Sequence, residues 1–216
     1  MNKRSVIGAI IKSSSSGLRT GIPDIREVRV ELIRKSIHFL IALSPVMAAA
    51  NQTFTVAFLM IGTLGYALME TLRLRGIRVP VVSSLTYMAS RPKDKDRFVL
   101  GPVTLGLGAL LALLLYPAPA ASIAIYALAF GDGLASLIGK LFGRLRPVFL
   151  CGKSVEGSLV CFAAIFFTAY GVFPDYRVAF WAALTGTLVE ALPLGDYDNI
   201  ALPVIVGLIV QITLLY

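Results

Sequence analysis

Residues 98–116 read FVLGPVTLGLGALLALLLY, an almost uninterrupted apolar stretch close to the ~20 residues that a helix needs to cross a bilayer. The run 105–116 within it lacks the alternation of polar and apolar residues that a strand of a membrane barrel requires. Every backbone polar group inside the hydrocarbon must find a partner within the protein, which a helix provides by itself. The stretch therefore predicts an all-α transmembrane fold.

The rest of the chain repeats this pattern. Of the 216 residues, 57% are apolar and 15% are charged, and the mean hydropathy is +0.81, which excludes an ordinary soluble domain. Turn signals separate about seven hydrophobic segments, which lie at 32–50, 53–71, 98–116, 118–141, 154–173, 176–192 and 199–216. We expect a transmembrane catalytic domain over 31–216, preceded by an amphipathic segment, 1–30, on the cytoplasmic membrane surface.

The positive charges predict the orientation of these spans. With seven spans, every one of the 20 Lys and Arg residues except Arg177 falls on one side of the membrane. That side is cytoplasmic by the positive-inside rule, so the N-terminus is predicted to lie inside. The net charge of +8 then orients the protein and attracts anionic headgroups, and nucleic acid is not an expected partner. The membrane would be the inner membrane of a prokaryotic cell or the endoplasmic reticulum of a eukaryotic one.

Four polar clusters fall at the cytoplasmic ends of the predicted spans. In the first, helical spacing places Glu31, Arg34, Lys35 and His38 on one face. The structural alternative is a basic belt with one ion pair, from Glu31 to Arg34 or to Lys35. His38 lies about one turn deeper, where a titratable group is costly and therefore a functional candidate.

The second cluster, 130–144, has the sequence FGDGLASLIGKLFGR. Asp132, Ala135, Gly139 and Gly143 form a stripe on one helical face, and small residues in such a stripe also serve close helix packing. Packing does not explain the carboxylate of Asp132. An aspartate flanked by glycines within a span suits Mg²⁺, with room for a phosphate to approach the backbone.

The third cluster is 152–158, GKSVEGS. It is not a P-loop, because proline stands at 147 where that motif needs glycine. Ser154 can cap a helix whose first N–H groups favour an anion, and Lys153, Arg144 and Arg146 can bind phosphate oxygens. An ordinary helix start is the structural alternative.

The fourth cluster, 195–199, places Asp196, Asp198 and Asn199 before the last span, with Glu190 one helix end upstream. This cluster fits a polar turn with a helix cap, or acidic groups that face Asp132 and complete a cation site. Glu70 is interpreted as a partner of Arg73.

These clusters resemble a family. The matching pieces are Arg34-Lys35-x-x-His38, Gly131-Asp132-x-x-Ala135-x-x-x-Gly139 with Gly143-Arg144, Lys153-Ser154-x-Glu156-Gly157, and Asp198-Asn199 with Pro203. In this order, over about 30–216, they resemble the CTP-dependent lipid-alcohol kinases: the dolichol, polyprenol and phytol kinases and the CTP-dependent diacylglycerol kinases. The central stretch is also similar to the phosphatidate cytidylyltransferases, whose longer signature this chain lacks.

The resemblance implies CTP as phosphate donor, Mg²⁺ as cofactor, and a lipid alcohol from the bilayer as acceptor. The catalytic residues it implies are Asp132, Arg34, Lys35 and, as the base, His38. The implied nucleotide-binding residues are Gly139, Lys140, Gly143, Arg144, Lys153, Ser154, Glu156 and Gly157. The implied metal ligands are Asp132, Asp198, Asn199 and Glu156.

Two other functions compete with the kinase. A cytidylyltransferase would use the same nucleotide and ion but transfer CMP to phosphatidate. An ion-coupled transporter would use Glu70, Asp132 and Glu190 as an ion path. Transporters place such groups near the membrane midplane between repeats, whereas here the polar residues gather at one face and no repeat is visible. Phytol, polyprenol and diacylglycerol all need similar apolar grooves, so the acceptor is predicted only as a class, and the sequence predicts no oligomeric state.

Overall fold

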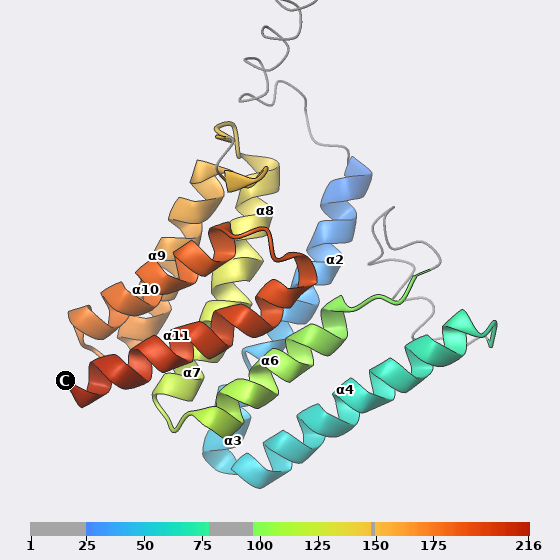
Figure 1. Ribbon diagram of the computed structural model, residues 1–216, viewed down its shortest axis with the longest axis horizontal. Helices are drawn as coiled ribbons and strands as arrows, with labels where there is room; N and C mark the ends of the chain where they lie inside the picture. Colours follow the sequence, from blue (N-terminus) through green and yellow to red (C-terminus); the bar gives the residue numbers. More distant parts are fainter. Residues whose placement is uncertain (1–24, 78–96, 148–149) are drawn as a thin grey trace, which may run out of the picture.

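The computed structural model describes residues 25–77, 97–147 and 150–216, with side chains from residue 28 onward (Figure 1). The elements are α2 (Ile25–Ile41), α3 (Ser44–Ala50), α4 (Gln52–Leu74), α6 (Gly101–Leu115), α7 (Ala120–Tyr126), η3 (Ala127–Asp132), α8 (Gly133–Leu141), α9 (Val155–Val172), α10 (Tyr176–Ala191), η5 (Gly195–Tyr197) and α11 (Asp198–Leu215). The all-α class is thus confirmed. Most of the predicted amphipathic segment, 1–24, lies outside the described residues.

Each predicted hydrophobic segment coincides with helix, but not every helix is long enough to be a candidate span. Within the described residues, five are long and apolar enough to cross a membrane: Val28–Ala50, Gln52–Leu74, Ala120–Leu141, Val155–Val172 and Gly195–Leu215. The helices α6 and α10 have only 15 and 16 residues, or about 22–24 Å at 1.5 Å per residue. They fall short of the ~30 Å hydrocarbon core. The count of seven spans and the inside N-terminus therefore stay predictions.

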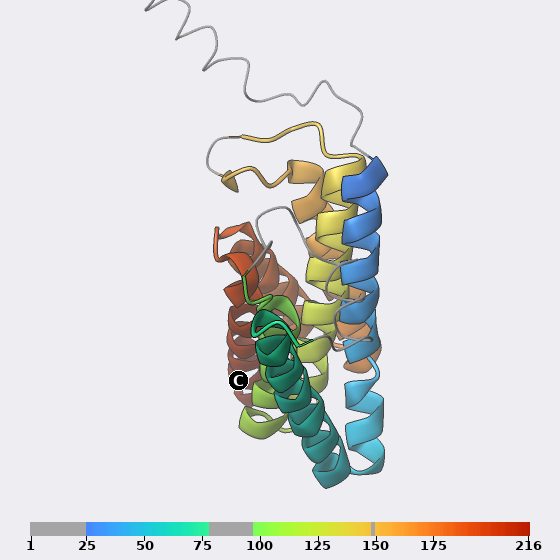
Figure 2. The ribbon, with the colours of Figure 1, turned by 90° about the vertical axis from the view of Figure 1, so that its right-hand side faces the viewer.

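The helix that runs through α7, η3 and α8 forms the centre of the bundle. In the candidate span Ala120–Leu141, 67% of the residues in its apolar 18-residue stretch are buried, against 22% in the corresponding stretch of Gln52–Leu74. Helices α2, α9 and α11 all pack against this central helix, and α10 joins α9 to α11. Helix α4 lies on the outside of the bundle and packs against α6: Figure 1 shows it at the lower edge beside α6, and in Figure 2 it lies in front of α6.

Polar and apolar side chains are distributed as expected for a protein whose solvent is lipid. The charged side chains of Glu31 and Lys35 are buried, whereas Ile61 on α4 is 72% exposed and Phe167 on α9 is 71% exposed. Apolar side chains gain nothing from leaving hydrocarbon, while buried charges must find partners inside the protein. The partners of these charges therefore locate the candidate site.

Glycines allow the central helices to approach closely. A Cβ at Gly157 would lie 2.8 Å from the carbonyl oxygen of Ala135, and one at Gly139 would lie 2.9 Å from Ser154 Oγ. A Cβ at Gly143 would overlap the carbonyl oxygen of Gly139. The packing role predicted for the small-residue stripe is confirmed at the contact between α8 and α9.

The contact between α6 and α11 is equally tight and can be tested. A methyl group at Gly108 would overlap the carbonyl oxygen of Asn199. We expect Gly108→Ala to lower the melting temperature of the detergent-purified protein, because overpacking costs about 1–3 kcal/mol. In the control Gly62→Ala the methyl group meets nothing within 4 Å, so the melting temperature should hold or rise slightly. Equal melting temperatures would contradict the tight contact.

Candidate functional site

The inward face of α2 carries the first charged cluster. Glu31, Lys35 and His38 are buried on this face and Arg34 lies at its edge, which confirms the shared face. Within α2, Glu31 pairs with Arg34, at 2.8 Å. Lys35 turns instead to Asp132, with Nζ 2.5 Å from Oδ2. His38 Nδ1 lies 3.0 Å from the same oxygen, so three residues predicted to be catalytic meet at one point.

Asp132 is the last residue of η3, a π-helical turn inside the central helix. Such turns are rare and are frequently found at functional sites. The glycines beside it do not leave the open space that we expected for a phosphate. A Cβ at Gly131 would lie 2.8 Å from Ile165, and one at Gly133 would lie 2.8 Å from the ring of Phe39. That expectation was wrong, because these glycines let α9 and α2 close on either side of the carboxylate.

Glu31 joins α2 to α8. Lys140 Nζ donates to its Oε2 at 2.5 Å, and Ser136 Oγ donates to Oε1 at 3.1 Å. Lys140, predicted to bind nucleotide, is therefore held at the end of α8 by a buried carboxylate. The sequence presented Glu31 only as a partner within α2, since its neighbours on α8 are more than 100 residues away.

Three carboxylates converge at the candidate site, and Asp132 is one of them. One oxygen each from Asp132, Glu190 and Asp198 lies within 4.8 Å of the other two. Two oxygens bound to one cation are at most twice the metal–oxygen distance apart, about 4.2 Å for Mg²⁺ and about 5 Å for Ca²⁺. The cluster thus has the donor type and nearly the spacing that a hard divalent cation needs.

The other two predicted metal ligands make different contacts. Asn199 Nδ2 donates to Thr104 Oγ1 at 2.9 Å and ties α11 to α6. Glu156 Oε1 accepts from the backbone N–H groups of Arg144 and Leu145, at 2.9 and 3.1 Å. The structure therefore brings together two of the four predicted ligands, and the third carboxylate is Glu190.

A small pocket of about 170 Å³ opens beside the carboxylates. Its lining residues are Glu31, Ala135, Ser136, Gly139, Lys140, Arg146, Gly152, Lys153, Ser154, Gly157, Ser158 and Glu190. Five of the predicted nucleotide-binding residues are among them, at 139, 140, 153, 154 and 157. Gly143 and Arg144 are not part of the lining, and Arg144 is exposed.

Local contacts shape the rim of this pocket. Ser154 caps α9 as predicted, with its Oγ accepting from Gly157 N at 3.1 Å. Lys153 donates to Glu190, both to Oε1 at 2.9 Å and to the backbone carbonyl oxygen. Arg146 donates to the carbonyl oxygens of Gly139 and Gly152. Two cationic side chains are thereby fixed next to the start of a helix.

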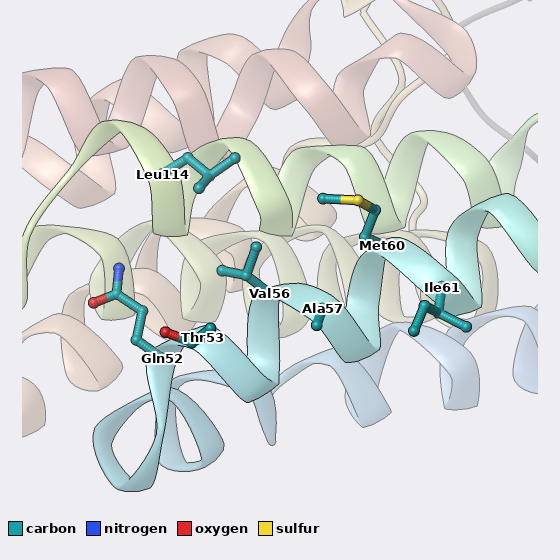
Figure 3. Close-up of a pocket in the computed structure, with 7 residues that line it drawn as sticks. All are labelled: Gln52, Thr53, Val56, Ala57, Met60, Ile61 and Leu114. Carbon is teal, nitrogen blue, oxygen red and sulfur yellow. The ribbon is translucent and has the colours of Figure 1, made fainter.

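A larger groove of about 520 Å³ lies elsewhere, between the start of α4 and the end of α6 (Figure 3). Its lining residues are Gln52, Thr53, Val56, Ala57, Met60, Ile61 and Leu114. None of them is charged, and none belongs to the four polar clusters. The chemistry of the candidate site therefore resides in the smaller, charged pocket.

Glu190 is the residue that sequence reasoning underrated. It was noted beside the fourth cluster but was not assigned as a ligand, although it is the acidic residue inside the hydrophobic segment 176–192. An ionisable group within such a segment was the signal that could have identified it. Glu70 accepts two hydrogen bonds of 2.8 Å from Arg73, which confirms the partner interpreted from the sequence.

The pair of Lys35 and Asp132 is expected to stabilise the fold. Removing one partner leaves a buried charge uncompensated, which costs about 3–5 kcal/mol. We therefore expect Lys35→Met to lower the melting temperature clearly and Lys35→Met/Asp132→Asn to recover part of the loss. The control Arg177→Met breaks an exposed pair with Asp175, 3.3 Å apart, and should change little. A single Lys35 variant as stable as wild type would contradict this role.

Comparison with known proteins gives distant relatives. The chain is 26% identical to phytol kinase 1, chloroplastic, of Arabidopsis thaliana, over 82% of this chain and 64% of the relative. It is 25% identical to a probable phytol kinase 1 of Oryza sativa subsp. japonica, over 59% and 46% of the two chains, and 27% identical to one of Glycine max, over 63% and 52%. The chain thus spans less than two thirds of the length of these curated relatives.

No model of a protein family matches this chain, and no solved structure matches it. The charged pocket lies in a chain whose described part is a bundle of helices with five candidate membrane spans, and the chain is similar to plant phytol kinases.

Proposed function

We propose that this chain is a Mg²⁺-dependent membrane kinase that transfers the γ-phosphate of CTP to the hydroxyl group of a lipid alcohol. One observation carries the proposal: a pocket edged by Lys140, Arg146 and Lys153 directly adjoins a cluster of three carboxylates. Phosphoryl transfer needs this pairing, with cationic groups for the phosphates and carboxylates for the metal ion. The similarity to phytol kinases supports a lipid alcohol as acceptor.

The polyphosphate would lie in the pocket at the start of α9. The first N–H groups of a helix attract anions, and the cationic side chains at 140, 146 and 153 surround this helix start. Gly139 and Gly157 line this pocket and let α8 and α9 pack closely, which brings the start of α9 next to the cationic side chains. The cytidine base would occupy the adjoining segment within 139–157.

Asp132 and Asp198 would hold Mg²⁺, as the sequence predicts. When bound, the ion neutralises the charge that develops on the transferring phosphoryl group. Lys35 and Arg34 lie on the α2 side of the same site, where their positive charges would stabilise that charge further. Within this proposal Asn199 and Glu156 support the site through the contacts that fix α11 and the 144–145 backbone.

His38 is the proposed base for the lipid hydroxyl. The closeness of Nδ1 to the Asp132 carboxylate favours the tautomer with its proton on Nδ1, so Nε2 keeps a lone pair. Nε2 would take the hydroxyl proton as the alcohol oxygen forms its bond to the γ-phosphorus and the bond to the β-phosphate oxygen breaks, releasing CDP. The apolar outer surface of the bundle allows the lipid to arrive sideways from the bilayer.

Labelled nucleotide tests this function directly. Purified protein in detergent would receive Mg²⁺, a panel of lipid alcohols with phosphatidate, and CTP labelled at either the γ- or the α-phosphate. Label in the lipid phase from the γ position alone is the expected result, and the mobility of the product identifies the acceptor. Label from the α position alone would overturn the kinase and establish a cytidylyltransferase, which suits the same nucleotide and ion.

We expect Asp132→Asn to reduce turnover at least about a hundredfold, since it removes a charge that the metal site and His38 both require. The variant should still insert into membranes, but with a lower melting temperature, because Lys35 loses its buried partner; turnover is therefore compared per amount of folded protein. Turnover at saturating lipid and nucleotide is the measurement. Near-normal turnover would remove Asp132 from the reacting centre.

We expect Lys153→Ala to raise the KM for the nucleotide about tenfold or more, because charge-assisted hydrogen bonds contribute about 1.5–3 kcal/mol. The KM for the lipid should change much less. Arg177→Ala, which alters an exposed cation in the α9–α10 region, is the control and should leave both constants unchanged. An unaltered nucleotide KM would place the phosphates elsewhere.

A further inference from the structure

The two carboxylate oxygens of Glu190 have different surroundings. Oε1 accepts from Lys153 Nζ at 2.9 Å, on the pocket side. Oε2 is buried and has no hydrogen-bond partner among residues 25–77, 97–147 and 150–216. A buried carboxylate oxygen without a partner is costly, so its retention requires an explanation.

The position of Glu190 explains why this buried oxygen lacks a hydrogen-bond partner among the described residues. Its carboxylate belongs to the cluster with Asp132 and Asp198, in which one oxygen of each lies within 4.8 Å of the others. Lys35 and His38 both contact Oδ2 of Asp132, on the α2 side of that carboxylate. Three acidic groups this close repel one another, and the repulsion is relieved by a cation between them.

We propose that Glu190 is shared: it is the third carboxylate ligand of the divalent cation, while its other oxygen holds Lys153 at the edge of the phosphate pocket. The identity of the anion as a nucleotide rests on the proposed function, but the cation site does not. Lys153 and the cation then compete for the same negative charge. Cation binding loosens the hold of Glu190 on Lys153 and releases the ammonium group to bind phosphate.

This sharing makes the two binding events depend on each other. An ion at the carboxylates makes the pocket more positive in two ways, through its own charge and through the released lysine. By thermodynamic reciprocity, an anion that engages Lys153 strengthens cation binding by the same factor. Glu190 is therefore the residue through which the metal and the anion are loaded together.

Titration with Mn²⁺ alone tests the proposal, with the free ion followed by electron paramagnetic resonance. The full chain is kept in detergent without nucleotide or lipid. We expect Glu190→Gln to weaken Mn²⁺ binding at least tenfold, and Lys153→Gln to strengthen it severalfold, because the competing ammonium is gone. Asp175→Asn, which changes a half-buried carboxylate outside the site, is the control and should bind Mn²⁺ like wild type. Melting temperatures identify any variant that fails to fold.

The outcomes separate this inference from the proposed function. Wild-type Mn²⁺ affinity in a folded Glu190→Gln variant, or no Mn²⁺ binding by wild type, would overturn the shared ligand. Unchanged or weaker binding in Lys153→Gln would overturn the competition. If both variants behave as expected but no label from CTP reaches any lipid, the cation site stands and the kinase proposal fails.

Discussion

The contact between Lys35 and Asp132 is the interaction on which the rest of the structure depends. Both side chains are buried, and taking each ion out of water costs several kcal/mol that only close pairing can offset. The pair fixes how α2 rotates against the central helix, because any other rotation would strand a charge in an apolar interior. Once α2 is set, Glu31 reaches Lys140 on α8 and His38 reaches the same carboxylate. One buried ion pair thereby positions a whole row of functional candidates.

Much of this arrangement can be predicted from the sequence, and the rest cannot for a physical reason. Apolar length predicts helices, and the 3.6-residue period places Glu31, Lys35 and His38 on one face, because both are properties of a single segment. The residues that this face contacts in the folded protein depend on other segments, so they cannot be predicted from this segment alone. Lys35 turns to Asp132 instead of to Glu31, and Lys153 finds Glu190, 37 residues away, across a helix contact. Glycine is also ambiguous, since space for a ligand and space for a neighbouring helix require the same missing side chain.

The candidate site is built on helices, and this matters for its chemistry. Asp132 belongs to a π-helical turn in the most buried span, Glu190 lies at the end of α10, and Asp198 begins α11. Groups on packed helices keep their mutual distances better than groups on loops, which favours electrostatic stabilisation over large movements. The outer helix α4 contributes none of these groups. Its fully buried residues are Thr55, Thr63 and Glu70, and many of its large apolar side chains are exposed, as expected of a helix that faces lipid.

The close packing of α8 against α9 has a consequence for how relatives of this chain are read. At Gly143 any side chain would overlap the carbonyl oxygen of Gly139, whether or not a nucleotide is ever bound. Close packing alone therefore accounts for a glycine at this position. A glycine motif shared by distant homologues then indicates a shared fold, and it does not by itself indicate a shared substrate. The acidic and basic residues around the pocket are the better guide to chemistry, because close packing does not require their charges.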